Sequence, residues 1–216
     1  MYRNRIKRLL DIFLSACGIL CLSWLLLLLA VAIKLDSPGP VFFRQKRVGI
    51  GKRHFQILKF RTMRIDTPHD MPTHLLHDPE QYITRMGRFL RKTSLDELPQ
   101  LINILRGDMS FIGPRPERPE IIAQYTEVMP EFAFRMKVKA GLAGFAQVYG
   151  KYNTSPYDKL KLDLTYIENY SVWLDLKLML LTLKVLFWPD STEGVESEQV
   201  TAFKAEYDGR AEKDDN

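Results

Sequence analysis

Cysteine is nearly absent from this sequence, and two common nucleotide-binding motifs are missing. The only cysteines, Cys17 and Cys21, lie inside an apolar run, which argues against a disulfide framework and fits a reducing cytosol. The chain has no Gly-x-x-x-x-Gly-Lys-Ser/Thr loop and no Gly-x-Gly-x-x-Gly fingerprint, so nucleotide binding of those two kinds is unsupported. No internal repeat is present.

Acidic residues are scarce before the C-terminal end. Residues 190–216 hold nine acidic and three basic side chains, a net charge of −6, whereas the whole chain carries +5. Residues 1–189 therefore carry +11, which indicates an anionic partner such as lipid headgroups, a phosphorylated metabolite or nucleic acid. The acidic tail lacks a sustained apolar period and is predicted to be partly disordered.

A long apolar run covers Leu9–Ile33, with Asp11 as its one charge. A helix of that length is about 37 Å long, enough to cross a hydrocarbon core of about 30 Å. No small-residue cleavage site follows it, so we interpret it as a retained anchor rather than a secretory signal. Basic residues flank both ends and favour a cytoplasmic location for both. A straight span and a re-entrant helix bent near Gly18 or Ser23 both remain open on these grounds.

The rest of the chain predicts an α+β fold that is mostly helical. The β-rich stretches "VFFRQKRV" and "HFQILKF", joined by Gly49–Lys52, predict a small antiparallel hairpin. Residues 66–81 are expected to form a loop. Apolar periodicity predicts helices at 83–92, 96–105, 119–128 and 157–168. The apolar run at 172–188 is interrupted by charges, so we expect an interfacial amphipathic helix, with a buried core helix as the alternative.

The adjacent acids Asp96 and Glu97 can be interpreted in two ways. Ser94-Leu95-Asp96-Glu97 matches a capping box, and Pro99 is tolerated only near a helix start. The alternative is a catalytic pair, because a helix start also favours bound phosphate through its N–H groups and dipole. The pair alone favours the cap.

Basic residues that could hold a diphosphate lie nearby in the sequence. Arginine forks match phosphate oxygens, and prolines on both sides of one arginine stiffen its backbone. A solvated basic face is the alternative, which we prefer for Arg85 and Arg88. The candidates for phosphate binding are Lys59, Arg61, Arg91 and Arg115, the last within Pro114-Arg115-Pro116.

Two further segments are weaker candidates. His69, His74 and His77 have a spacing that suggests zinc, but the segment lacks cysteines, so solvated histidines are the better interpretation. The glycine-rich segment "GLAGFAQVYGKY" (141–152) suits either a close approach to a ligand or a tight turn.

The chain resembles the bacterial sugar transferases, specifically the small monotopic polyprenyl-phosphate phosphoglycosyl transferases. The resemblance spans roughly residues 5–185. Its matching segments are "KRLLDI", "KLDSPGPVFFRQKRVG", "LKFRTM", "GRFLRKTSLDELPQLINILRGDMSFIGPRP", "GLAGFAQVYGK" and "LDLTYIENYSVWLDLKLMLLT".

The resemblance implies an enzyme on the cytoplasmic face of the bacterial inner membrane, acting in a surface glycan pathway. It would move a sugar-1-phosphate from a UDP-sugar to polyprenyl phosphate and release UMP. Asp96 would be the nucleophile that forms a covalent phosphosugar, and Glu97 would bind Mg²⁺. Lys59, Arg91 and Arg115 map to the basic binding residues, and Pro114–Pro116 to the segment that faces uridine.

Other implied features are less specific. Gln147, Asp163 and Asp175 match family-typical positions, with a substrate-binding role or a structural polar network equally plausible. The implied architecture is a re-entrant membrane helix at 1–35, a membrane-associated catalytic domain at 36–189 and the acidic tail at 190–216. Many members have Ser-Pro at the helix break, whereas here Trp24 follows Ser23. The charges on both flanks still favour re-entry.

Two alternative functions belong to other functional classes. A membrane-anchored nucleic-acid binder would use the basic body as its footprint. Its cations would be arrayed with stacking aromatics, whereas here they surround an acidic pair. A non-catalytic scaffold for polysaccharide assembly would tolerate Asp96→Asn.

Overall fold

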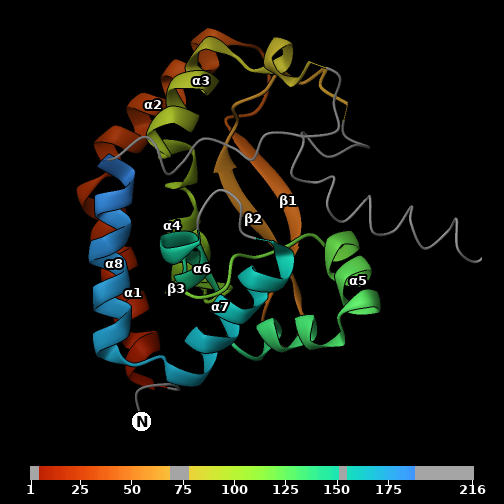
Figure 1. The fold of residues 1–216 in the computed structure, drawn as a ribbon. Coiled ribbons are helices and arrows are strands. Elements are labelled where there is room, and N and C mark those ends of the chain that lie inside the picture. Colours follow the sequence, from red (N-terminus) through yellow and green to blue (C-terminus); the bar gives the residue numbers. More distant parts are fainter. Residues whose placement is uncertain (1–4, 69–77, 151–154, 188–216) are drawn as a thin grey trace, which may run out of the picture.

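The computed structural model describes residues 5–68, 78–150 and 155–187 (Figure 1). The fold is mostly helical, as predicted, with two small pairs of strands. In chain order the helices and strands are α1 (Lys7–Cys21), α2 (Ser23–Asp36), β1 (Phe42–Val48), β2 (His54–Phe60), α3 (Arg85–Thr93), α4 (Gln100–Arg106), β3 (Met109–Ile112), α5 (Pro119–Val128), β4 (Ala140–Ala143), α6 (Phe145–Tyr149), α7 (Pro156–Asn169) and α8 (Val172–Phe187).

The N-terminal apolar run forms two helices rather than one. They meet at Leu22 with a bend of 62°, directly before Ser23, while Gly18 stays inside α1. The Ser23 hydroxyl donates to the Leu20 carbonyl at 2.8 Å. Within the described residues, neither helix alone is long and apolar enough to cross a membrane. The bent pair passes that test by length and composition.

Large apolar side chains are exposed on α1, α2 and α8. Trp24 is 66% exposed and Trp173 is 80% exposed, whereas aromatic residues of this size are usually mostly buried in soluble domains. These side chains are here named the apolar face, together with the other exposed apolar residues of the three helices: Leu9, Phe13, Leu20, Leu27, Leu28, Val31, Leu35, Leu176, Leu180 and Leu183. A surface of this extent indicates a partner of apolar character.

The helices that carry the apolar face are joined to the body by polar contacts. Asp11 of α1 is 4% exposed, and its carboxylate accepts from the Ser110 hydroxyl at 3.0 Å and from the Phe111 N–H at 3.1 Å. Lys7 forms an ion pair with Asp175 of α8. Because α2 also contributes Leu29 and Ile33 to a core cluster with body residues, α1 and α2 pack as part of the core. The domain boundary at residue 35 stays a prediction.

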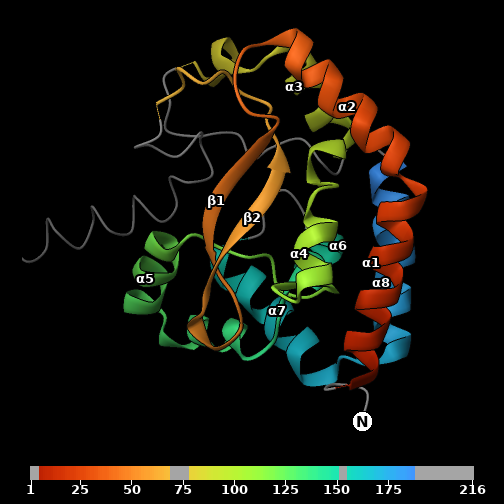
Figure 2. The ribbon, with the colours of Figure 1, turned by 180° about the vertical axis from the view of Figure 1, so that it is seen from behind.

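The predicted hairpin is confirmed, and an asparagine holds it against α4. β1 and β2 pair antiparallel from Phe42↔Phe60 to Val48↔His54. Asn103 of α4 is fully buried. Its side chain accepts from the Leu58 N–H at 2.9 Å and donates to the Gln56 carbonyl at 2.8 Å, so it supplies the polar groups that a third strand would. Figure 2 shows α4 between the hairpin and α1, which fixes the start of α4 beside the end of β2.

The parallel pair of β3 and β4 was not predicted. Met109 pairs with Ala140 and Ile112 with Ala143. Glycines bring the two backbones together: a Cβ on Gly141 would lie 2.2 Å from the Gly113 nitrogen, and one on Gly144 would lie 2.3 Å from the Gly113 carbonyl oxygen. The glycine-rich segment therefore serves backbone packing at these positions, and its residues Phe145–Tyr149 form the helix α6.

We expect Gly141→Ala to destabilise the protein by about 1–3 kcal/mol, because the three nearest atoms that its Cβ would meet all belong to the backbone and cannot rotate away. Chemical denaturation of purified protein measures this change. Gly49→Ala is the matched control, because the added Cβ meets a Phe55 ring edge at 3.3 Å and the Arg53 carbonyl oxygen at an ordinary contact distance of 3.5 Å. An equal loss in both variants would contradict the packing argument.

The other elements agree largely with prediction. The helices expected at 83–92, 119–128 and 157–168 are α3, α5 and α7, and the run at 172–188 is the helix α8. The helix expected at 96–105 begins later, at Gln100. His69, His74 and His77 and the tail at 190–216 lie outside the described residues.

Candidate active site

Asp96 and Glu97 lie in a single 3-10 turn, Leu95–Glu97, between α3 and α4. The predicted capping box is wrong. Ser94 has φ +55° and ends α3 in the left-handed region, its side chain caps nothing, and α4 begins after Pro99. Consecutive residues of a 3-10 turn project about 120° apart, so the two carboxylates point in different directions. They share cationic neighbours, but only Glu97 accepts hydrogen bonds from them.

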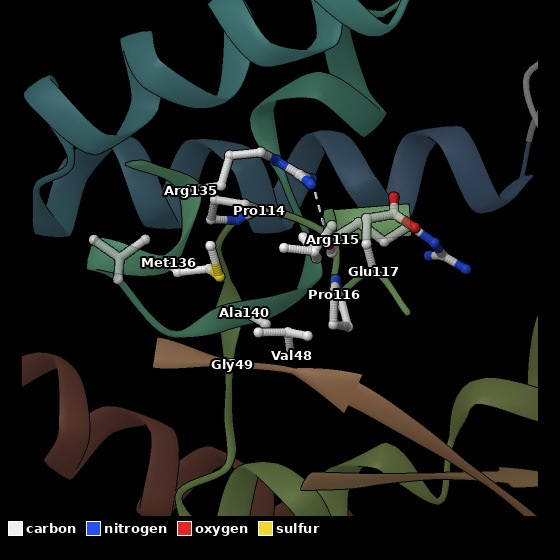
Figure 3. A pocket seen from close by; sticks show the side chains of 11 residues that line it. Val48, Gly49, Pro114, Arg115, Pro116, Glu117, Arg135, Met136 and Ala140 are labelled. Atoms are coloured by element: carbon white, nitrogen blue, oxygen red, sulfur yellow. Dashed lines mark hydrogen bonds between the residues drawn. The ribbon is translucent and has the colours of Figure 1, made fainter. Parts of the chain in front are cut away.

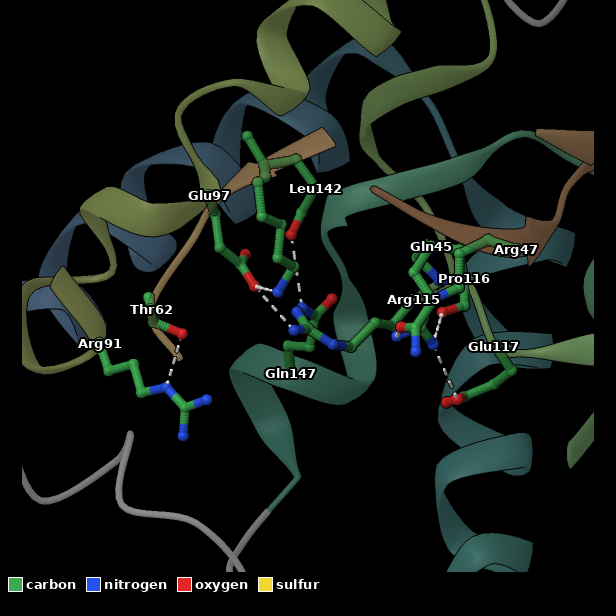
Figure 4. Close-up of polar contacts among 11 residues, drawn as sticks. Gln45, Arg47, Thr62, Arg91, Glu97, Arg115, Pro116, Glu117, Leu142 and Gln147 are labelled. Carbon is green, nitrogen blue, oxygen red and sulfur yellow. Dashed lines mark hydrogen bonds and ion pairs between the residues drawn. The ribbon is translucent and has the colours of Figure 1, made fainter. Parts of the chain in front are cut away.

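Glu97 is held by two cations (Figure 4). Its Oε1 accepts from Lys59 Nζ of β2 at 2.6 Å and from an Arg115 terminal nitrogen at 2.7 Å. Burial alone would raise the pKa of Glu97, but Arg115 and Lys59 outweigh it and lower the pKa to about 2. Oε2 has no hydrogen bond within the described part of the chain. Glu97 is thus an anion at neutral pH, and its second oxygen accepts no hydrogen bond from the described residues.

Asp96 is a contrasting carboxylate. It makes no hydrogen bond or ion pair with any residue that the structure describes, and it is half-buried. Burial raises the pKa of Asp96 and the Glu97 charge adds to this rise, while Lys59, Arg91 and Arg115 oppose it. An unpaired, partly desolvated carboxylate among cations, with a perturbed pKa, is a candidate functional group.

Arg91 and Arg115 both oppose the rise in the pKa of Asp96, so both lie close enough to act on it electrostatically. Arg91, in the last turn of α3, donates through Nε to the Thr62 hydroxyl at 3.0 Å, which leaves its terminal nitrogens without a partner in the described structure. Arg115 follows β3, and its raised pKa results chiefly from the Glu97 charge. Lys59, Arg91 and Arg115 are therefore the predicted binding residues that the fold brings together.

The other predicted binding residues have structural partners. Arg61 is 6% exposed and donates to the Ser37 and Pro38 carbonyls, where it fixes the chain after α2. Asp163 pairs with Arg135 at 2.7 Å, and Asp175 accepts from Lys7 and Tyr166. The substrate-binding roles of Arg61, Asp163 and Asp175 stay predictions.

Gln147 and the two prolines lie beside the cations. Gln147 of α6 donates to the Leu142 carbonyl at 3.4 Å and is drawn next to the Arg115 guanidinium (Figure 4). Pro114 and Pro116 line a cavity of about 10 Å³ behind Arg115 (Figure 3), room for about one water molecule. This cavity cannot admit a sugar nucleotide.

Sequence reasoning missed two arginines that contact the Pro114–Pro116 segment. Arg47 of β1 donates to the Pro116 carbonyl at 3.0 Å, and Arg135 donates to the Arg115 carbonyl at 3.0 Å. The contacts join residues 69 and 20 positions apart. No local pattern marks either arginine, so only the fold reveals them.

We expect Glu97 to make stability fall in acid. Because its pKa is depressed in the folded state, its contribution is fully present above the unfolded value of 4.5 and is lost as the pH falls towards about 2. The shift corresponds to a contribution on the order of 3 kcal/mol. Urea denaturation of the parent and of Glu97→Gln from pH 7 to pH 3 measures it. The gap in unfolding free energy between them should narrow in acid, and a constant gap would contradict the ion-pair argument.

The chain matches one known protein family over most of its length. The family model described as "Bacterial sugar transferase" matches residues 2–189. A UDP-glucose:undecaprenyl-phosphate glucose-1-phosphate transferase of Caulobacter vibrioides is 45% identical over 192 residues, covering 86% of this chain and 71% of the relative. A UDP-N-acetylgalactosamine-undecaprenyl-phosphate N-acetylgalactosaminephosphotransferase of Aeromonas hydrophila is 41% identical, covering 84% of this chain.

The relatives differ in length. The chain spans 43% of the Aeromonas hydrophila protein and 94% of a Bacillus subtilis relative named "Uncharacterized sugar transferase EpsL", to which it is 40% identical.

Proposed function

Because this chain belongs to the bacterial sugar transferase family, we propose that it moves a sugar-1-phosphate from a UDP-sugar to undecaprenyl phosphate or a similar polyprenyl phosphate. The names of the relatives support both substrate classes. The observation that carries the proposal is the unpaired Asp96 carboxylate beside Glu97, whose charge is held by Lys59 and Arg115. A scaffold without catalysis gives no reason to keep such a carboxylate unpaired.

The proposed reaction has two displacements at one phosphorus. An Asp96 oxygen attacks the β-phosphorus of the UDP-sugar, a P–O bond to Asp96 forms, and the bond to the α-phosphate oxygen breaks, so UMP leaves. A phosphate oxygen of the polyprenyl phosphate then attacks the same phosphorus. The Asp96–phosphorus bond breaks and returns the carboxylate. No proton has to be removed from the nucleophile at neutral pH.

The cations supply electrostatic stabilisation. Arg91 has terminal nitrogens that can hold phosphate oxygens, and Arg115 and Lys59 offer positive charge where the transferred group becomes more anionic. Both Arg115 and Lys59 are fixed in advance by Glu97. They therefore need little reorganisation during the reaction.

The acidic pair fits a magnesium ion shared with a substrate. Among the described residues there is no cluster of three side chains that could form an all-protein metal site. Mg²⁺ commonly binds one or two carboxylates together with substrate phosphates, and Glu97 has one oxygen without a hydrogen bond, directly beside Asp96. When bound, the ion would neutralise charge on the diphosphate. Glu97 would hold it and leave Asp96 to react.

For location, we propose that the apolar face lies in the cytoplasmic membrane of a bacterium and that α1 and α2 form a re-entrant pair. The 62° bend and the basic residues on both flanks support this arrangement. The interfacial prediction for α8 is part of the same proposal, since its exposed leucines continue the apolar face.

The re-entrant arrangement predicts that both ends of the chain are cytoplasmic. Reporter tags placed before residue 1 and after residue 216 should both be shielded from reagents that enter only the periplasm. A protein with one straight membrane-crossing helix provides the positive control for exposure. A periplasmic N-terminus would contradict re-entry without affecting the proposed chemistry.

Intact-protein mass spectrometry tests the activity and the intermediate. The protein is incubated with individual UDP-sugars and Mg²⁺ in the absence of lipid acceptor, and a sugar-phosphate adduct is expected on Asp96. The sugar that labels the protein identifies its donor. If UMP release requires the lipid and no UDP-sugar gives an adduct, the covalent proposal is wrong.

A further inference from the structure

The backbone from Pro114 to Glu117 is held at each of its four carbonyl groups. Every one of these carbonyls accepts a hydrogen bond from a residue in another part of the chain. The donors to the carbonyls of residues 114, 115, 116 and 117 are, in that order, Gly141 N at 2.9 Å, Arg135 at 3.0 Å, Arg47 at 3.0 Å and Val48 N at 3.0 Å. The segment that carries the Arg115 guanidinium is thus fixed from several sides.

The contact at the Arg115 carbonyl differs from the others because a buried ion pair makes it. Arg135 is 8% exposed and Asp163 of α7 is 2% exposed. Arg135 Nε donates to Asp163 at 2.7 Å, and a terminal nitrogen of the same guanidinium donates to the Arg115 carbonyl (Figure 3). The guanidinium also stacks over the Phe132 ring at 4.7 Å. Asp163 and Phe132 therefore set the plane in which Arg135 presents its second donor.

The two prolines make this carbonyl decisive for the direction of Arg115. Proline fixes φ at residues 114 and 116, and Pro116 has no N–H, so the Arg115 carbonyl is the only polar group of its peptide link. A hydrogen bond to that carbonyl restricts ψ of Arg115. Its side chain leaves from the same Cα and reaches Glu97 at 2.7 Å. Fixing the carbonyl thus fixes where the guanidinium begins.

We propose that Arg135 and Asp163 are positioning residues that hold Arg115 against Glu97 and, through it, set the geometry of the acidic pair. Stability alone is a weak reason for such a buried pair, because apolar residues of similar volume often stabilise a core equally well. The expected effect on catalysis rests on the proposed transferase activity. The ordering of Arg115 by Arg135 is a geometric proposal that does not depend on that activity.

Arg135→Lys is the informative variant. Lysine keeps the charge that faces Asp163 but lacks the planar fork that reaches the Arg115 carbonyl at the same time. We expect kcat per folded molecule to fall by about 10–100-fold with a smaller change in KM, since misplacement of a group by about 1 Å costs up to that much. Leu178→Ala is the matched control, because Leu178 lies on α8, is fully buried and packs in an apolar cluster that does not contain Phe132. It should destabilise the fold but leave kcat per folded molecule within about twofold.

A double-mutant cycle separates positioning from general damage. If Arg135 acts through the Arg115 guanidinium, Arg135→Lys should cost less than about twofold in kcat when Arg115 is already alanine. Independent effects of the two substitutions would overturn the proposal. An equal loss of kcat in Leu178→Ala would also overturn it, because that result would make any destabilisation of the core sufficient.

Hydrogen exchange of the Arg115 guanidinium requires no catalysis, so it tests the positioning of Arg115 separately from the proposed function. In ¹⁵N-arginine-labelled protein, the Arg115 guanidinium protons should exchange more slowly in the parent and in Leu178→Ala than in Arg135→Lys. If no variant, including the parent, transfers a phosphosugar but this pattern holds, the transferase proposal fails and the positioning of Arg115 stands. Slow exchange in Arg135→Lys would overturn the positioning itself.

Discussion

Asp96→Asn is expected to reduce phosphosugar transfer by more than about 10³-fold, because an amide cannot form the proposed bond to phosphorus and enzymes lose a comparable factor when a nucleophile is removed. The covalent adduct should disappear in the same variant. Transfer is measured as lipid-dependent UMP release, and the adduct by intact mass. A scaffold that assembles other enzymes would retain its role with asparagine at this position.

The unfolding free energy of Asp96→Asn shows whether a loss of transfer comes from the missing carboxylate or from a damaged fold. Burial raises the pKa of Asp96, so at neutral pH its charged form is less favourable in the folded protein than in the unfolded chain. The neutral amide should therefore leave the unfolding free energy unchanged or higher, as expected where activity conflicts with stability. Asp66→Asn, at an exposed ion pair with Arg64, provides the control for surface charge. An inactive Asp96→Asn that also unfolds readily would not establish a nucleophile; retained transfer would contradict the mechanism.

Glu97→Gln is expected to lower kcat by about 10²–10³-fold, the range for loss of one preorganised electrostatic group. Glutamine keeps one oxygen that can accept from Lys59 and Arg115 but carries no charge, so both cations lose their anionic partner. The proposed magnesium site loses its ligand as well. We expect the Mg²⁺ concentration required for half-maximal transfer to rise, which a titration of rate against Mg²⁺ measures.

The matched control for Glu97→Gln is Glu80→Gln. Glu80 forms an exposed pair with Arg88 at 3.8 Å, and exposed pairs contribute little. Its transfer rate and Mg²⁺ requirement should equal those of the parent. If Glu97→Gln changed the rate while the Mg²⁺ requirement stayed constant, Glu97 would serve the cations alone and the metal proposal would be wrong.

Local sequence patterns predicted most helices and the hairpin, whereas the β3–β4 pairing and the conformation of Ser94 depend on contacts distant in the sequence or on backbone conformation. Periodicity located α3, α5 and α7 and alternation located the hairpin, because each signal lies within one segment. The pair of β3 and β4 was missed because each strand has only four residues and their pairing depends on glycines that permit close backbone approach. The capping box failed because Ser94 adopts a left-handed conformation that its sequence does not demand.

The candidate site shows the same division. Lys59, Arg91, Arg115 and the acidic pair were recognisable as charges that flank a turn. The sequence did not reveal that Glu97 pairs with Lys59 and Arg115, because that pairing depends on the placement of β2 beside α4 by Asn103. Charge type could not separate Arg61 from the others either. It differs by facing the carbonyls of residues 37 and 38, a property of tertiary packing.

The buried carboxylate of Asp11 has a consequence for biosynthesis. Its two hydrogen-bond donors, Ser110 and Phe111, lie 99 and 100 residues later in the chain. At a synthesis rate of about 5–20 residues per second, Asp11 emerges roughly 5–20 s before the groups that satisfy it. The first helix therefore reaches its final surroundings only after half of the chain has been made, and a ribosome stalled before residue 110 would leave it incompletely assembled.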